Sequence, residues 1–241
     1  MNLFCKLSFI LLLICGPFFG SVAQLTVFNV SSSDITDFRK VSVQQQFEVD
    51  DQIESSTTFT YGLGRNWEIG MNLINLNFSL KDRQFEFNDT STAIPFSPLL
   101  LVNAQKVFEL SDQLSFGIGG VGGRTLVSHH HGSFAYFGYA NLAYSAGLDG
   151  QYQFAAGPYI GNHRYLGDGP SYGVQAAFDA GIWYKKLHLL GDWISGSHQK
   201  GKLSLGFGIF LAERFPVSFG WQRSNDDGAQ AGVIQFTFLP K

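Results

Sequence analysis

The sequence predicts an all-β protein, namely a closed antiparallel transmembrane β-barrel of about twelve strands. Apolar residues alternate with polar residues from residue 41 to the end of the chain. Short connections alternate with longer ones, and aromatic side chains gather beside the short connections. A period of two indicates strands, and the rhythm of short turns and long loops is typical of barrels that span an outer membrane.

Residues 1–23 are predicted to form a signal peptide that is cleaved after Ala23. Lys6 is the only charge before the apolar run from Leu7 to Cys15, and the small residues Gly20-Ser21-Val22-Ala23 suit a signal peptidase. The run is shorter than the roughly 20 residues that a permanent membrane helix needs. A lipoprotein signal acylated at Cys15 is the alternative, and it is disfavoured because Ile14 stands where a small residue is expected.

The composition of the mature chain excludes several classes of function. Cleavage removes both cysteines, Cys5 and Cys15, so thiol chemistry and disulfides are not available. Cleavage also removes Lys6 and no acidic residue, which changes the formal net charge from −3 to −4 and argues against nucleic acid as a partner. No later apolar run is long enough for a membrane helix, so strands must make any crossing.

The alternating pattern divides the chain into a lead-in and a barrel. Residues 24–40 are expected to be a periplasmic lead-in, and residues 41–241 the barrel, with a bulge after Leu73 where the apolar parity shifts. An even number of strands places both termini in the periplasm. The short connections are predicted at 64–66, 111–113, 145–150, 185–186 and 212–214, and the longer ones at 50–54, 81–98, 125–133, 162–172, 195–201 and 223–229.

Aromatic residues near the short connections predict a girdle at the level of the lipid headgroups. The members of this girdle are Tyr61, Trp67, Phe108, Tyr144, Tyr152, Tyr184 and Phe215. The alternative is a soluble β-sandwich or a lipocalin-like barrel, in which these rings would point inward. That alternative is disfavoured because the opposite face of the strands is rich in Gly, Ser, Gln, Asn and acidic residues, which suit a wet lumen better than a soluble exterior.

Two short segments resemble a family. Tyr61-Gly-Leu-Gly-Arg-Asn-Trp-Glu-Ile-Gly70 and Asp192-Trp-Ile-Ser-Gly196 resemble elements of small Gram-negative outer-membrane barrels of the porin-like and transporter-like group. The resemblance implies a location in the outer membrane, contact with its lipid, and insertion by the barrel assembly machinery. One departure is the C-terminus, where Leu239-Pro240-Lys241 follows Phe238 although such barrels commonly end on an aromatic residue.

The polar face predicts a lumen, and the lumen predicts the function. A narrow pore for passive or weakly selective passage of small hydrophilic solutes is expected, with no cofactor and no enzymatic activity. The alternative is a plugged barrel in which these polar groups only satisfy one another. The candidate lumen-lining residues are Glu48, Glu68, Gln153, Tyr159, Gln175, Asp179, His188, Asp192 and Lys202.

Histidines carry two further hypotheses. His188 and Asp192 are four residues apart on one strand and share a face, so they are candidates for a cation site or an acid–base pair, although a hydrogen-bond network is the more common role of such groups. His129-His130-His131 follow one another in a predicted outside loop and can bind a transition metal only if the loop is irregular. A solvated polar loop is the simpler interpretation, and no metal site is predicted.

Two other functions compete with the pore. A lipid hydrolase on a twelve-stranded barrel would need a triad such as Ser128, a loop histidine and Asn141 on the lipid-facing rim, but no nucleophile motif frames Ser128. A structural or adhesive envelope barrel is the third possibility, although only the 81–98 loop is long. That loop, with Phe85, Phe87 and Pro95, is expected to fold inward as a constriction if the pore is gated.

Overall fold

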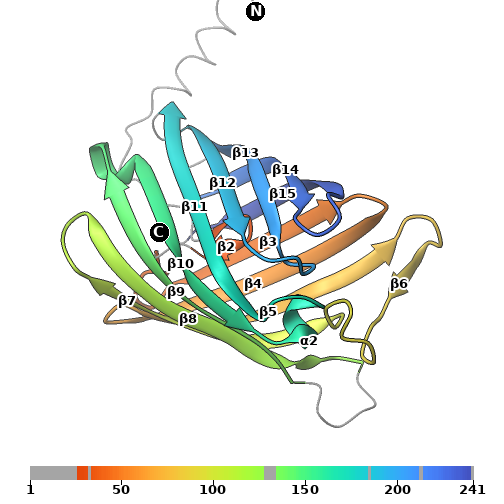
Figure 1. Ribbon diagram of the computed structural model, residues 1–241. Helices are drawn as coiled ribbons and strands as arrows, with labels where there is room; N and C mark the ends of the chain where they lie inside the picture. Colours follow the sequence, from red (N-terminus) through yellow and green to blue (C-terminus); the bar gives the residue numbers. More distant parts are fainter. Residues whose placement is uncertain (1–25, 32–33, 128–133, 184–185, 212–213, 240–241) are drawn as a thin grey trace, which may run out of the picture.

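The barrel is built as the alternating pattern predicts. The computed structural model describes residues 26–31, 34–127, 134–183, 186–211 and 214–239. Within these residues, twelve antiparallel strands form one sheet, and the pairing of β4 with β5 closes it into a barrel (Figure 1). The wall strands are β3 (Val41–Val49), β4 (Gln52–Gly64), β5 (Trp67–Ser79), β7 (Leu99–Glu109), β8 (Leu114–Thr125), β9 (Phe134–Ala146), β10 (Tyr152–Gly161), β11 (Tyr172–Trp183), β12 (Leu187–Ile194), β13 (Lys202–Phe210), β14 (Pro216–Ser224) and β15 (Gln230–Phe238).

Short elements accompany the wall. The strands β1 (Thr26–Val27) and β2 (Val30–Ser31) pair with each other, and β6 (Gln84–Glu86) adds to the end of β5. A 3-10 turn, η1 (Leu148–Gly150), and one helical turn, α2 (His163–Leu166), lie in connections. Among the described residues, no helix is both long enough and apolar enough to cross a membrane.

One connection at the long-loop end is shorter than predicted. The sequence places a loop at 50–54, but β3 ends at Val49 and β4 begins at Gln52, so Asp50 and Asp51 alone make the turn. The Gln52 N–H donates to Asp50 Oδ1 over 2.7 Å, a local bond that Asp forms readily in tight turns. The strict alternation of short and long connections therefore fails at this first turn, and Glu54 becomes part of the wall.

The predicted bulge is confirmed in β5. Ser55 pairs with Leu76 and Thr57 pairs with Leu73, so β5 carries one extra residue between these two pairs. Asn75 within the bulge adopts a φ of 56°, a left-handed conformation that Asn tolerates better than most residues. As a result, Ile74 and Asn75 are both buried although they are adjacent in the strand.

The wall is apolar outside and polar inside. On β13, Leu205, Phe207 and Ile209 are exposed, whereas the residues between them are buried. The predicted girdle residues in the described part, from Tyr61 to Phe215, are also exposed. Tyr184 lies outside the described residues. A continuous apolar exterior over a polar interior suits a hydrocarbon environment and contradicts the soluble alternative, in which the rings would point inward.

Lys106 supports the position of the girdle. Its Nζ lies 5.6 Å from the Trp67 ring centre and 5.5 Å from that of Phe108, and it contacts the Arg65 carbonyl in the short turn. A lysine on the outer face beside aromatic rings is typical of the membrane interface, where its ammonium group can reach water. The short-turn end therefore has the chemistry of a headgroup boundary.

Candidate functional site

The interior of the barrel contains hollows that follow one another from the long-loop end to the short-turn end. The long-loop cavity has a volume of about 270 Å³, and Glu48, Asp50, Glu54, Lys200 and Lys202 are among its lining residues. The central cavity, about 170 Å³, is lined in part by the strands β3 to β5. The short-turn pocket, about 30 Å³, lies beside Gln153 and Asp179.

Four charged residues separate the first two cavities. Glu48, Glu54 and Lys200 line both of them, so these side chains form the boundary. Lys200 Nζ lies 2.9 Å from Glu54 Oε1, and Lys202 Nζ lies 2.6 Å from Glu48 Oε2. Lys200 also donates to Asn75 Oδ1 over 2.6 Å, which uses the inward Asn of the bulge. The passage therefore narrows at two ion pairs, which we call the charged constriction.

The protonation of Lys200 follows from its surroundings. Burial in the loop 195–201 disfavours the charged ammonium group, but the carboxylates of Glu54 and Glu48 outweigh burial and raise the pKa of Lys200 above its usual value. Lys200 is therefore a cation at neutral pH. Its partner Glu54 is in β4 only because the first turn is short, which is why the sequence prediction did not include it.

The N-terminal residues occupy part of the lumen. Residues 26–31, which we call the N-terminal strap, contact the barrel wall at Asp192. The backbone N–H groups of Asn29 and Val30 donate to Asp192 Oδ2 over 2.5 and 3.0 Å. The Asn29 side chain donates to Ser204 Oγ over 2.8 Å, and Asn141 donates to the carbonyl oxygen of Ser31 over 2.8 Å. These bonds connect the strap to β9, β12 and β13.

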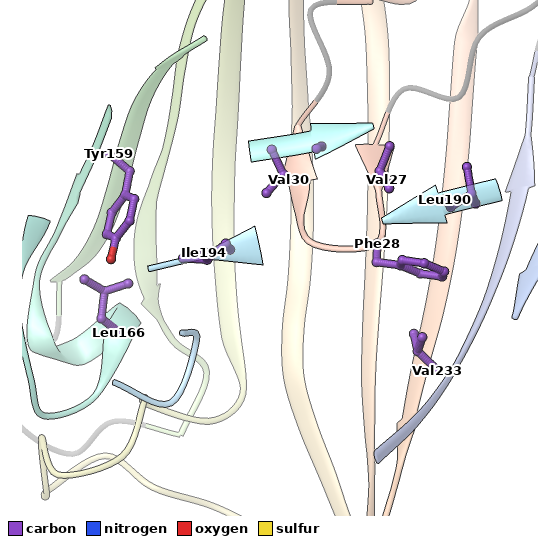
Figure 2. Close-up of a cluster of buried hydrophobic side chains, with 9 residues drawn as sticks. Val27, Phe28, Val30, Tyr159, Leu166, Leu190, Ile194 and Val233 are labelled. Carbon is purple, nitrogen blue, oxygen red and sulfur yellow. The ribbon is translucent and has the colours of Figure 1, made fainter. Parts of the chain in front are cut away.

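Apolar contacts complete the seat of the strap. Val27, Phe28 and Val30 are buried in one cluster with Leu190 and Val233 (Figure 2). The ring of Phe28 needs two glycines in the wall, because a Cβ atom on Gly206 or on Gly220 would lie 2.8 Å from its Cζ atom. These glycines pair with each other across β13 and β14, so they leave one gap that the ring fills.

The chain after the strap reaches the opposite wall. The Thr36 N–H donates to Glu68 Oε2 over 2.7 Å, and the Thr36 hydroxyl lies within hydrogen-bond distance of Ser42 and Thr60. Glu68 is on β5 and Asp192 is on β12, and these strands are six apart in either direction around the ring of twelve. The strap and Thr36 therefore bond to opposite sides of the lumen.

The position of this segment differs from the sequence prediction. The sequence predicts residues 24–40 as a periplasmic lead-in, whereas the strap and Thr36 are packed inside the barrel. The physical reason is that the inner wall offers an apolar patch at Leu190 and Val233 and a buried carboxylate at Asp192. The apolar side chains of the strap cover the patch, and its backbone N–H groups donate to the carboxylate.

The paired histidine inside the barrel has a different partner from the expected one. His188 Nδ1 lies 2.5 Å from Asp179 Oδ1, not beside Asp192. Residues four apart on a strand share a face but are separated by about 13 Å along it, so His188 and Asp192 do not meet. Asp179 is instead a diagonal neighbour across the β11–β12 pair. The hypothesis of a His188–Asp192 pair is therefore not supported: His188 is hydrogen-bonded to Asp179, and Asp192 binds the strap.

The other candidate residues also lie on the inner face. Gln175 donates to Asn141 Oδ1 over 2.9 Å, and Tyr159 donates to the Ser195 carbonyl over 2.5 Å. The Tyr159 hydroxyl also lies 2.7 Å from His198 Nε2, a contact that holds the loop 195–201. Alternation along the sequence does not predict His198 and Lys200, because they lie in the loop 195–201, where side-chain direction has no period of two. It does not predict Glu54 either, because the sequence places a loop at 50–54 where the structure has strand β4.

One residue of the hydrolase hypothesis, Asn141, does not lie where the triad requires it. Asn141 is fully buried inside the barrel and bonded to Ser31 and Gln175, so it is not on the lipid-facing rim that such a triad requires. Ser128 and His129 to His131 lie outside the described residues, and the hypotheses on them stay untested.

The 81–98 loop is divided between the two sides. Phe85 and Phe87 are exposed, since β6 extends the sheet away from the lumen. Pro95 lines the long-loop cavity, and the Phe96 N–H donates to the Arg164 carbonyl over 2.8 Å. The end of the loop near Pro95 therefore faces the long-loop cavity, and the two phenylalanines do not.

Comparisons with known proteins identify the fold. No family model and no curated protein matches the sequence. The NanC porin is similar with a TM-score of 0.55 at 11% identity, covering 84% of this chain and 100% of that chain. The KdgM porin has a TM-score of 0.60 at 9% identity, covering 83% and 99%, and its complex with disordered oligogalacturonate has a TM-score of 0.58 at 9% identity. At these identities the likeness concerns the fold, which is that of an outer-membrane porin-like barrel.

Proposed function

We propose that the protein is a narrow outer-membrane channel for the passive or weakly selective passage of small hydrophilic solutes. The observation that carries the proposal is the continuity of the polar interior. The long-loop and central cavities share Glu48, Glu54 and Lys200 as walls, so a solute that passes these side chains moves from one cavity to the other. A barrel of twelve strands lies between barrels of eight strands, whose interior is just wide enough for side chains to fill, and those of 16–18, which leave an aqueous channel.

The fold and the exterior support this proposal. The apolar outer face and the girdle suit an outer membrane, with the short turns and both termini on the periplasmic side and insertion by the barrel assembly machinery. The signal peptide of residues 1–23 would deliver the mature chain there. NanC and KdgM, which have similar folds, are porins, and one KdgM structure is a complex with oligogalacturonate. Solute passage through this chain is inferred by analogy of fold.

The test is the conductance of the purified mature chain in a planar lipid bilayer. Stable unitary steps that scale with salt concentration are expected. In parallel, the same preparation is assayed for release of fatty acid from phospholipid vesicles. If neither the mature chain nor a variant without the strap conducts, and fatty acid is released, a lipid hydrolase would replace the channel. Silence in both assays would favour a structural role in the envelope.

A further inference from the structure

The long-loop cavity carries an excess of negative charge. Its wall contains the carboxylates of Glu48, Asp50, Glu54 and Asp227 and the ammonium groups of Lys200 and Lys202. Four acids against two lysines leave a formal charge of −2. In a concave cavity with walls of low dielectric constant such a charge raises the local concentration of cations.

The two lysines are already engaged, but two of the acids have no cationic partner among the residues that the structure describes. Lys202 pairs with Glu48, and Lys200 bonds to both Glu54 and Asn75. Asp50 and Asp227 instead accept backbone N–H groups of Gln52 and Ala229 over 2.7 and 3.0 Å. The Ala229 N–H also holds the pKa of Asp227 below its usual value, so this carboxylate stays ionised. Both carboxylates retain lone pairs for a ligand.

A buried amide in the same wall lacks a partner. Gln222 on β14 is only 2% exposed and lines the long-loop cavity. Its Oε1 and Nε2 atoms have no hydrogen-bond partner among the described residues. Buried polar side-chain atoms are in large majority hydrogen-bonded in native proteins, and an unpaired one is costly. The amide therefore leaves one donor group and one acceptor atom open to a polar molecule in the cavity.

We propose that the long-loop cavity is a binding site for small organic cations that carry ammonium or guanidinium groups. Such a solute donates to the carboxylates of Asp50 and Asp227 and to the Gln222 carbonyl oxygen, while its charge offsets the excess of acids. The carboxylates of Glu48 and Glu54 are held by lysines. Those of Asp50 and Asp227, which we call the rim, have no lysine partner among the described residues. The rim therefore selects the solute before the charged constriction.

This inference deepens the proposed channel and rests on it for the onward passage of the solute. It also separates this chain from a solute of the oligogalacturonate kind, which is bound in a KdgM structure. Each galacturonate unit carries a carboxylate, and a cavity with a net charge of −2 repels it. The solute class is therefore set by the lumen and not by the shared fold.

The binding step is tested by calorimetry on the mature chain in detergent with three ligands of equal length. The ligands are 1,4-diaminobutane, butane-1,4-diol and succinate, which differ in charge. We expect the diamine to bind, the diol to bind more weakly and succinate to give no heat. Equal affinities for the three, or succinate binding more tightly than the diamine, would overturn the proposal.

Variants locate the site. The double variant Asp50→Asn/Asp227→Asn keeps both backbone bonds and is expected to weaken diamine binding by about tenfold or more, as loss of charge-assisted hydrogen bonds requires. Asp112→Asn, in the turn 110–113 at the other end, is the control and leaves binding unchanged. Gln222→Leu should weaken binding without loss of thermal stability, because it removes an unpaired buried amide. Unchanged affinity in both cavity variants contradicts the site.

Conductance separates this inference from the channel itself. Under a salt gradient the zero-current potential is expected to have the sign of cation preference and to shift towards anions in the double variant. Diamine binding without conductance would refute the channel and leave the site in place. Conductance with anion preference and no diamine binding would refute the site and leave the channel.

Discussion

The backbone N–H of Asn29 and the carboxylate of Asp192 are joined by a hydrogen bond of 2.5 Å inside the barrel. Asp192 Oδ2 also accepts the Val30 N–H over 3.0 Å, so one buried carboxylate holds two consecutive backbone groups. The partner residues are more than 160 positions apart in the sequence. This contact fixes the N-terminal strap against β12, inside the lumen.

Removal of the strap should widen the conducting path. Deletion of residues 26–31 takes away the side chains of Phe28 and Asn29 from the wall of the central cavity, and it joins that cavity to the space beside the short-turn pocket. We expect a larger unitary conductance in a planar bilayer than for the intact mature chain. Equal conductance of the two proteins would mean that the strap does not obstruct the path.

Loss of the Asp192 carboxylate should release the strap. Asp192→Ala leaves the N–H groups of Asn29 and Val30 buried and unpaired, at a cost of about 1–3 kcal/mol for each. Val30 is fully buried, and the mature chain predicted here contains no cysteine, so Val30→Cys reports on the strap by maleimide labelling. We expect labelling to become about tenfold faster or more when Asp192→Ala is added.

The control for this labelling experiment is Asp112→Ala in the turn at the short-turn end. It removes a carboxylate of the same type from an exposed position, so the rate for Val30→Cys should not change. If labelling is already fast in the otherwise intact chain, the strap does not stay in its seat and the prediction fails.

The sequence was sufficient for the wall but not for the strap. Period-two alternation predicts each strand locally, and even the bulge at Asn75 is visible as a shift of apolar parity. The seat of Phe28 depends on Gly206 and Gly220, which become one gap only through the register of β13 with β14. No local pattern contains that register, and for the same reason the His188–Asp179 pair could not be distinguished from His188–Asp192.

The charged constriction was partly predictable. Glu48 and Lys202 were both assigned to the inner face from alternation, since each lies on a regular strand. Lys200 lies in a loop, where side-chain direction has no period, and Glu54 was placed in a loop that the structure shows to be strand. Lys200 and Glu54 are 146 residues apart in the sequence, and they meet only because the sheet closes into a barrel.

A charged side chain on the outer face should lower the free energy of unfolding strongly in the middle of the wall and only slightly at its edge. Phe207 is 50% exposed between Leu189 and Phe219 on the neighbouring strands, whereas Leu211, 74% exposed, lies beyond the end of β13. Arginine facing lipid costs about 2–4 kcal/mol near the bilayer midplane and about 0–1 kcal/mol near the interface. Equilibrium unfolding in lipid vesicles should therefore show a large loss for Phe207→Arg and a small one for Leu211→Arg. Equal losses would contradict the assigned membrane position.

The loop 195–201 should respond to pH in opposite senses at its two titrating residues. Burial and the charge of Lys200 lower the pKa of His198, so its neutral form is favoured in the fold. The stability from a neutral His198 is complete above its unfolded pKa of about 6.5 and is lost as pH falls through the lowered pKa. The pKa of Lys200 is raised, so its contribution is complete below about 10.5 and is lost as pH rises through the higher value.

Thermal unfolding of the mature chain in detergent between pH 4 and pH 8 tests the acidic side of this response, with the intact chain compared to His198→Gln. We expect the unfolding temperature of the intact chain to decrease as the pH is lowered below about 6.5. His198→Gln should remove part of that decrease, because Gln does not titrate in this range. His163→Gln is the matched control, since it replaces a histidine that is exposed on α2. If His163→Gln flattens the profile as much as His198→Gln does, the buried imidazole of the loop is not the group that senses acid.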